Sequence, residues 1–129
     1  MDQIPERVQQ FIANYIFSLS ELEILLYLRD AAEKCSADAV GRALLMYRPA
    51  AEPRLEALRV SGLISAVEMQ GERHYQYSPT AEQADLIDEL AKWYKSHPVG
   101  ITTLIFSKPI DNIIRGFADS FRIRKKEGE

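Results

Sequence analysis

The sequence has little of what secreted proteins and most enzymes carry. Its 129 residues include one cysteine, Cys35, so no intramolecular disulfide can form and a disulfide-stapled fold is excluded. The two histidines, His74 and His97, lack the short spacing by which two ligands on one helix hold zinc. The glycine-rich phosphate-binding motifs and the G-x-S-x-G motif of hydrolases do not occur. We therefore predict no metal, no cofactor and no enzymatic activity.

Long apolar runs and an excess of basic charge are also lacking. The longest apolar-rich run, residues 99–106, is far shorter than the roughly 20 residues that span a bilayer. No basic stretch followed by an apolar segment indicates a secretion signal, so we expect a cytoplasmic protein with no membrane partner. Sixteen basic and 19 acidic residues give a net charge of −3, which argues against a constitutive nucleic-acid coat protein.

A local basic cluster is compatible with that acidic balance. Four basic residues lie close together near residue 129, namely Arg122, Arg124, Lys125 and Lys126. A solvated terminal turn is the ordinary interpretation, and an arm that contacts phosphates is the alternative.

The first part of the chain has the spacing of helices. Apolar residues recur with helical periodicity over residues 4–17, which predicts an amphipathic helix. Ser20 followed by Glu23 is a capping-box pattern, so we expect a second helix from Ser20 to about Glu33. Its apolar residues cover more than one face, which places this helix at the centre of the fold. Ser36 can cap a third helix over residues 37–46, whose expected inward residues are Ala39, Val40, Ala43 and Leu44.

Two prolines mark the start of the next helix. Proline is tolerated in a first turn, where its missing N–H would have no helical partner, so the helix can begin at Pro49 or at Pro53. The sequence leaves this choice open. The helix is expected to end at Gly62, because glycine readily takes the left-handed backbone that follows a helix. The predicted inward residues are Ala51, Leu55 and Leu58.

After Gly62 the periodicity changes from helical to two-residue alternation. Residues 63–69 and 74–78 alternate between apolar and polar, and Gly71 lies in the turn between them. This pattern predicts a β-hairpin that ends at Pro79. Thr80 and Gln83 then offer a second capping box, which opens a helix that runs to about Tyr94.

The remaining segments are predicted as helices. Residues 99–106 are rich in β-branched side chains, which would allow a buried strand, but the flanking helices favour a helix. A final helix over residues 109–125 places apolar residues on one stripe. The large apolar side chains of these two segments include Phe106, Phe117 and Phe121.

The order of three helices and a hairpin resembles the winged helix-turn-helix fold of bacterial transcriptional regulators, in particular the MarR-like and PadR-like groups. The resemblance covers residues 20–79. The matching residues are Leu22 to Leu28 in the first helix, Val40, Ala43 and Leu44 in the second, Leu55, Leu58, Gly62, Leu63 and Ile64 in and after the third, and Tyr75, Tyr77 and Pro79 in the hairpin. It implies a mainly α fold, with a winged-helix domain at 20–79, an N-terminal helix at 1–19 and a helical extension at 80–129.

The resemblance also implies a function. Regulators of these groups place the third helix of the winged-helix domain in the major groove of duplex DNA, and the hairpin, or wing, on the neighbouring backbone. In this chain that helix is the one that begins at Pro49 or Pro53 and ends at Gly62. Their flanking helices form a homodimer, so we expect residues 4–17 and 80–125 to join two copies of this chain. Some place a small-molecule effector between the winged helix and the added helices. The aromatic residues after the wing, among them Trp93 and Tyr94, either line such a pocket or pack in the core and the dimer interface.

Helical phase selects the candidate DNA contacts. With Leu55 and Leu58 inward, Arg54 and Ser61 lie on the opposite face of the helix that ends at Gly62. Arg48 precedes this helix. Arg54 is the candidate for a guanine edge or a phosphate, and Arg48 is the candidate for a phosphate. On the wing, Arg73 and His74 follow the turn and complete the predicted site.

Four acidic residues near this site oppose contact with DNA: Glu52, Glu56, Glu68 and Glu72. They leave a second hypothesis open, namely a winged-helix module that binds a protein and not DNA. Cys35 also has two interpretations. Near the start of a helix its thiol would have a lowered pKa and be sensitive to oxidation, whereas a buried thiol would be inert.

Overall fold

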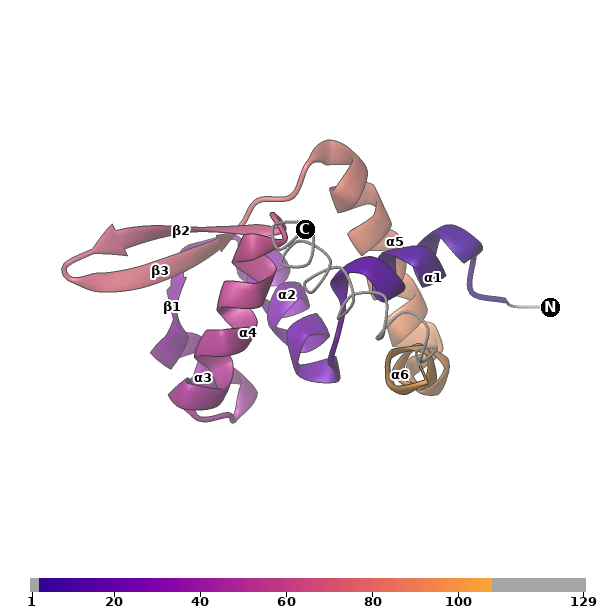
Figure 1. The fold of residues 1–129 in the computed structure, drawn as a ribbon, viewed down its shortest axis with the longest axis horizontal. Coiled ribbons are helices and arrows are strands. Elements are labelled where there is room, and N and C mark those ends of the chain that lie inside the picture. The colour runs from indigo at the N-terminus through magenta and orange to yellow at the C-terminus, as the bar shows by residue number, and fades with distance from the viewer. Residues whose placement is uncertain (1–2, 108–129) are drawn as a thin grey trace, which may run out of the picture.

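A computed structural model of the chain describes residues 3–107. Figure 1 shows α3, α4 and a hairpin gathered at one end, α1, α5 and α6 at the other, and α2 between them. The elements are α1 (Glu6–Tyr15), α2 (Leu19–Ala31), β1 (Cys35–Ser36), α3 (Ala37–Leu44), α4 (Arg48–Val60), β2 (Ile64–Met69), β3 (Glu72–Tyr77), α5 (Ala81–Ser96) and α6 (Pro98–Phe106).

The central helix, α2, begins earlier than predicted. The Ser18 hydroxyl accepts a hydrogen bond from the Glu21 N–H, so the cap is Ser18, and the expected cap at Ser20 is wrong. Both residues are serines just before an apolar run, and only the local backbone decides between them. Leu22, Leu25 and Leu28 are fully buried, which confirms the central position of this helix.

The third helix starts as predicted, with a strand before it that the sequence did not indicate. The Ser36 hydroxyl accepts from the Ala39 N–H at 3.1 Å and caps α3. Ser36 also ends β1, which pairs with β3 through Cys35 opposite Tyr75 and Ser36 opposite His74. Two residues are too short for a detectable alternation, which is why β1 was missed. The prediction that Ala43 faces inward is wrong, because Ala43 is exposed.

The choice between two starts for α4 is settled in favour of the longer helix. The helix begins at Arg48 with Pro49 in its first turn, and Pro53 lies in its interior. Ala51, Leu55 and Leu58 are fully buried, as the helical phase predicted. The chain leaves the helix through Gly62, whose φ of +89° is the left-handed conformation that glycine tolerates.

The hairpin has a two-residue turn. Gln70 and Gly71 have φ of +54° and +77°, and positive φ at both turn residues suits the right-handed twist of the flanking strands. β3 lies between β1 and β2 in the three-stranded antiparallel sheet. Residues that lie directly opposite share a face, so Glu68 and Arg73, which pair across the hairpin, point to the same side of the sheet.

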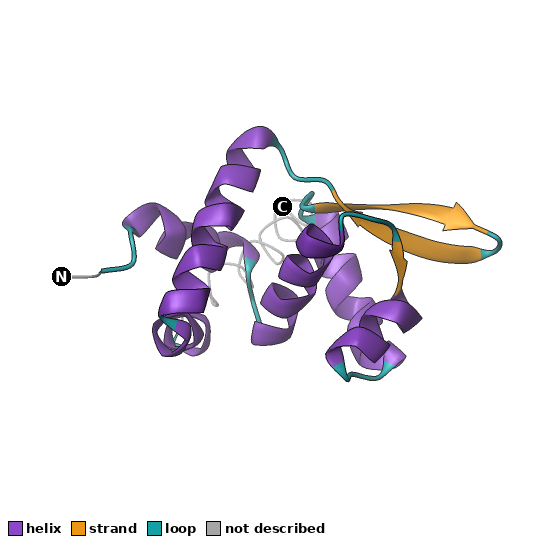
Figure 2. Cartoon of the chain, turned by 180° about the vertical axis from the view of Figure 1, so that it is seen from behind, coloured by secondary structure: helices purple, strands orange, loops and turns teal. Residues whose placement is uncertain are grey.

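The added helices pack beside this unit. Thr80 and Gln83 form the predicted capping box of α5, and residues 99–106 are helical, not a strand. α1 packs against α5 and α6, with α5 and α6 also in contact, and Figure 2 shows this group at the end opposite the hairpin. The predicted helix over 109–125 and the basic cluster at its end lie outside the described residues.

Ion pairs tie α5 to α1 and to α2. The Arg7 guanidinium of α1 donates to Glu89, and Arg29 Nε of α2 donates to Asp88 at 2.9 Å. Within residues 3–107, no single helix is both long and apolar enough to cross a membrane. α1 and α2 pass such a test only as a pair, and a bend of 104° separates them.

The close approach of α3 to the turn after it gives a testable prediction. A Cβ added to Gly41 would lie 2.6 Å from the backbone oxygen of Met46. One added to Gly100 would make only ordinary contacts, with the end of the Ile4 side chain at 3.4 Å and with the His97 Cβ at 3.8 Å. We expect Gly41→Ala to lower the free energy of unfolding by about 1–3 kcal/mol, because backbone must move. Gly100→Ala, the matched helical control, should be neutral or stabilising. Urea unfolding measures both, and equal stability of the two variants would contradict the packing described.

Candidate nucleic-acid interface

The candidate interface consists of the α3–α4 turn, the exposed side of α4 and the hairpin. The turn is tight, because Gly41 lies against Met46 and Leu45 takes a left-handed backbone with φ of +57°. Ala51, Leu55 and Leu58 fix one side of α4 in the core. The opposite side is therefore presented to solvent, next to the hairpin (Figure 1).

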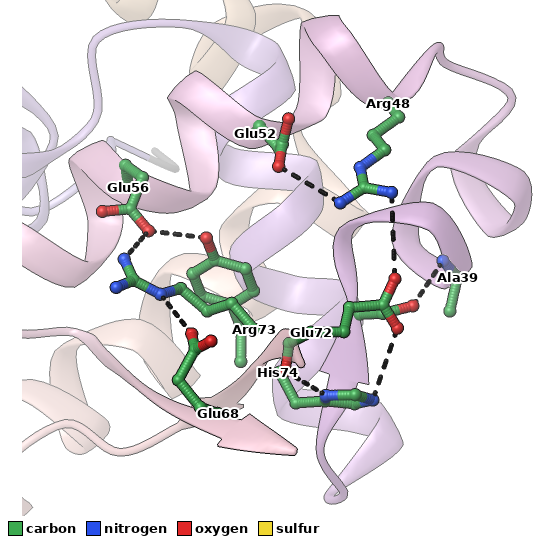
Figure 3. Close-up of polar contacts among 10 residues, drawn as sticks. Ala39, Arg48, Glu52, Glu56, Glu68, Glu72, Arg73 and His74 are labelled. Atoms are coloured by element: carbon green, nitrogen blue, oxygen red, sulfur yellow. Dashed lines mark hydrogen bonds and ion pairs between the residues drawn. The ribbon is translucent and has the colours of Figure 1, made fainter. Parts of the chain in front are cut away.

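Arg48 lies at the start of α4 and links it to the hairpin. Its guanidinium nitrogens are 3.6 Å from a Glu52 carboxylate oxygen and 3.8 Å from one of Glu72 (Figure 3). About half of the Arg48 side chain is exposed. The predicted phosphate contact is thus accessible, and it already has two carboxylate neighbours.

The Arg54 side chain does not extend outward from α4 as its helical phase predicted. Its side chain is half-buried, and one terminal guanidinium nitrogen donates to the Ala50 carbonyl at 2.7 Å. The Nε atom is buried and has no hydrogen-bond partner. Arg54 therefore lies along the flank of α4, where its own helix takes up part of its hydrogen-bonding capacity.

Arg73 and Glu56 form the centre of the site. Arg73 donates to Glu56 of α4 at 2.9 Å and to Glu68 of β2 at 3.2 Å. Glu56 also accepts a hydrogen bond from the Tyr75 hydroxyl and another from Arg59 at 2.9 Å. One carboxylate of α4 is thus joined to both the start and the middle of β3 (Figure 3).

These contacts shift the acid–base properties of the group. The hydrogen bond from Tyr75, followed by those from Arg73 and Arg59, lowers the pKa of Glu56 to about 2 although burial opposes the charged form. Burial and the bond to Glu56 raise the pKa of Tyr75 to about 12. The bond to Glu56, with that to Glu68, raises the pKa of Arg73. Glu56 is therefore ionised and the tyrosine neutral at any physiological pH.

The two other predicted site residues are engaged locally. His74 is one-fifth exposed, with Nδ1 3.2 Å from the Glu72 carbonyl oxygen and Nε2 3.9 Å from the Glu72 carboxylate. The Ser61 hydroxyl donates to the Leu58 carbonyl at 2.9 Å and closes the last turn of α4. The structure thus brings Arg48 and His74 together at Glu72. It holds Arg73 separately at Glu56, and leaves Ser61 at the far end of α4.

Charge on this surface is balanced. The arginines of α4 and the hairpin are matched in number by the glutamates there, in a set made up of Arg48, Arg54, Arg59 and Arg73 with Glu52, Glu56, Glu68 and Glu72. The sequence indicated that the glutamates oppose DNA contact, but it did not show that they bind the same arginines. The pairing of Glu56 with Arg73 spans 17 residues and two elements, so no local pattern reveals it.

The described residues also include Cys35, the aromatic residues after the wing and the positions where a metal could bind. Cys35 is buried in β1, and burial with the nearby Glu33 charge raises the pKa of its thiol, which agrees with the inert interpretation. Residues 3–107 hold no group of three or more potential metal ligands. Trp93 and Tyr94 pack partly buried against the core. A hollow of about 550 Å³ between α2 and α5 has Leu26, Tyr94, Lys92 and Lys95 on its walls.

The fold of this chain also occurs in solved structures that are described as DNA-binding regulators. A winged helix-turn-helix DNA-binding domain of Mb0332 from Mycobacterium bovis, described as homodimeric and as a possible ArsR-family regulator, superposes with a TM-score of 0.56 at 19% identity. That match covers 75% of this chain and 93% of the other. The fold is a winged helix-turn-helix.

Two regulators extend the match over nearly the whole chain. BpsR from Bordetella bronchiseptica, whose DNA binding is described as regulated by 6-hydroxynicotinic acid, has 18% identity and a TM-score of 0.55, covering 95% of this chain and 83% of its own. MepR from Staphylococcus aureus has 13% identity and a TM-score of 0.54, covering 94% and 87%. No protein-family model and no curated protein sequence matches this chain. The winged-helix prediction, made from residues 20–79, is confirmed.

Glu56 makes the stability of the winged helix depend on pH. A lowered pKa means that its contribution is complete above its ordinary value of 4.5 and is lost as the pH falls toward 2. Because about a third of the side chain is exposed, we expect Glu56→Gln to cost about 1 kcal/mol near neutral pH after solvent screening. Urea unfolding as a function of pH measures this cost.

The matched control is Glu23→Gln, which removes an exposed carboxylate from α2. The wild type and this control should lose stability in parallel between pH 4.5 and 2, whereas Glu56→Gln should lose less over that range. Identical pH profiles for all three proteins would show that Glu56 does not join α4 to the wing.

Proposed function

We propose that this protein is a winged-helix transcriptional regulator that binds duplex DNA as a homodimer in the cytoplasm. The observation that carries the proposal is the position of α4, which exposes one side to solvent directly beside the wing, with Arg48 between them. A helix of this kind fits the major groove, and a hairpin beside it reaches the adjacent backbone. Solved winged-helix structures described as DNA-binding support the assignment.

The proposed dimer uses the added helices. Val99 and Phe106 of α6 are about three-quarters exposed, although Ile101 and Ile105 of the same helix are buried in the core. Exposed apolar side chains of this size on a short helix indicate a further contact surface. The homodimeric state described for the Mycobacterium bovis domain supports this part of the proposal. Two copies would present two α4 helices to successive turns of a pseudo-palindromic site.

A second candidate function rests on the recognition surface itself. The solvent-facing side of α4 includes Pro49, Pro53, Ala57 and Val60, and the charges beside them cancel. Such a surface has the mixed apolar and polar character of a protein interface, and lacks the excess positive charge typical of DNA-binding domains. A winged-helix module that binds a protein partner is therefore the alternative.

The ion pairs of the wing predict how DNA affinity responds to charge. Glu68→Gln removes a carboxylate that holds Arg73, so we expect tighter binding to all sequences and a steeper dependence on salt, by about one unit in the logarithmic slope. Arg73→Ala should weaken binding to all sequences and reduce the slope by about one unit. Fluorescence anisotropy with a duplex fragment over a salt series measures both slopes.

Glu23→Gln is again the matched control, since it changes net charge equally on α2, next to Tyr94 of α5. It should leave the slope unchanged. If the wild type shows no salt-dependent binding to any genomic fragment at low ionic strength, DNA is excluded and the protein-binding module is the function.

The assembly has its own test. We expect light scattering at tens of micromolar to give twice the chain mass of 14.7 kDa. Replacing Val99 and Phe106 together by glutamate should produce monomers, because two charges would have to be buried. Replacement of exposed Val67 on the wing by glutamate is the control and should leave the dimer intact. A monomeric wild type would contradict the proposed dimer.

A further inference from the structure

The first turns of α4 offer few hydrogen-bond donors for base edges. Arg48 is shared between Glu52 and Glu72, and Arg54 donates to the Ala50 carbonyl. Bidentate recognition of guanine needs a guanidinium whose two nitrogens are both available. In this part of the described chain, both arginines are committed to partners within the protein.

Large apolar side chains occupy the end of α4 that would enter a groove. Leu45 is 93% exposed and Tyr47, which precedes the first residue of α4, is 85% exposed. These are the two most exposed large apolar side chains in residues 3–107. Pro49 and Pro53, also exposed, continue the apolar surface along the helix.

Leu45 is held there at a conformational cost. Its φ of +57° and ψ of +46° are the left-handed conformation, which is unfavourable for a residue with a Cβ and is usually given to glycine or asparagine. The side chain lies in solvent, so no burial offsets this cost. Ala32 ends α2 in the same left-handed conformation, so it is the large, fully exposed side chain of Leu45, more than its backbone, that points to a contact outside the chain.

The chemistry of the bases indicates which group in the major groove Leu45 and Tyr47 can contact. In the major groove, every base pair presents both hydrogen-bond donors and acceptors, and thymine alone adds a methyl group. We infer that Leu45 and Tyr47 recognise thymine 5-methyl groups, so that this protein selects thymine-containing sites mainly by apolar contact. The inference rests on the proposed DNA-binding function and names how the site would be chosen.

The test removes only the methyl group. Duplexes selected by the wild-type protein from a randomised library are resynthesised with deoxyuridine in place of single thymines, which changes no Watson–Crick hydrogen bond. We expect one or more positions in each half-site at which the substitution weakens binding about fourfold, the value for burying one methyl-sized group. Deoxyuridine outside the protected region is the control and should have no effect.

Variants assign the effect to the two side chains. Leu45→Gly and Tyr47→Ala should each bind thymine and deoxyuridine duplexes equally at the position that the replaced side chain contacts. Each variant should keep the discrimination at the position contacted by the other residue. Tyr47→Phe keeps the ring and should keep the discrimination. Leu45→Gly should also melt at the same temperature as the wild type or higher, because glycine relieves the left-handed backbone. A lost preference for thymine together with undiminished stability separates recognition from a folding defect.

The outcomes are distinct. Selected duplexes that bind with no effect of deoxyuridine at any position would overturn the inference and leave DNA binding intact. Equal discrimination by the wild type, Leu45→Gly and Tyr47→Ala would overturn the assignment to these residues. Failure of the wild type to enrich any duplex would overturn the proposed function and this inference with it.

Discussion

The carboxylate of Glu56 is the contact on which the recognition surface depends. It receives hydrogen bonds from Tyr75 and Arg73 of the wing and from Arg59 of its own helix, so it fixes the hairpin against α4. The same contact has a second consequence. Each arginine held by Glu56 is one cation fewer for a phosphate backbone, and the geometry of the wing is therefore obtained at the expense of positive charge.

Balanced charge changes what a winged helix can use for recognition. Where cations are free, affinity comes from the phosphates and specificity from donors on the helix. Here Arg48 and Arg73 are paired, while Leu45 and Tyr47 extend from the turn into solvent. In the proposed complex with DNA, such a surface would rely on shape and apolar contact more than on electrostatic attraction. The proposal therefore predicts modest non-specific binding and a preference set by the bases that the turn touches.

The sequence predicted the elements better than their interactions. Helical spacing gave α4 and its buried side at Leu55 and Leu58, and the change of period at Gly62 gave the hairpin, because those patterns are local. The strand β1 was missed because it owes its existence to pairing with β3. Arg54 was placed outward by phase alone, whereas its long side chain folds back along the helix to the Ala50 carbonyl. Ion pairs between distant elements and the exposure of Leu45 required the structure.

The most direct test of the central claim is a hydroxyl-radical footprint of the wild-type protein on a duplex that it selects. Two α4 helices carried by a homodimer should protect two backbone segments about one helical turn, or roughly 10–10.5 base pairs, apart between their centres. The protection should be symmetric about a pseudo-palindrome. Protection of a single segment would contradict the dimeric arrangement, and the absence of any protection would contradict the assignment of this winged helix to DNA.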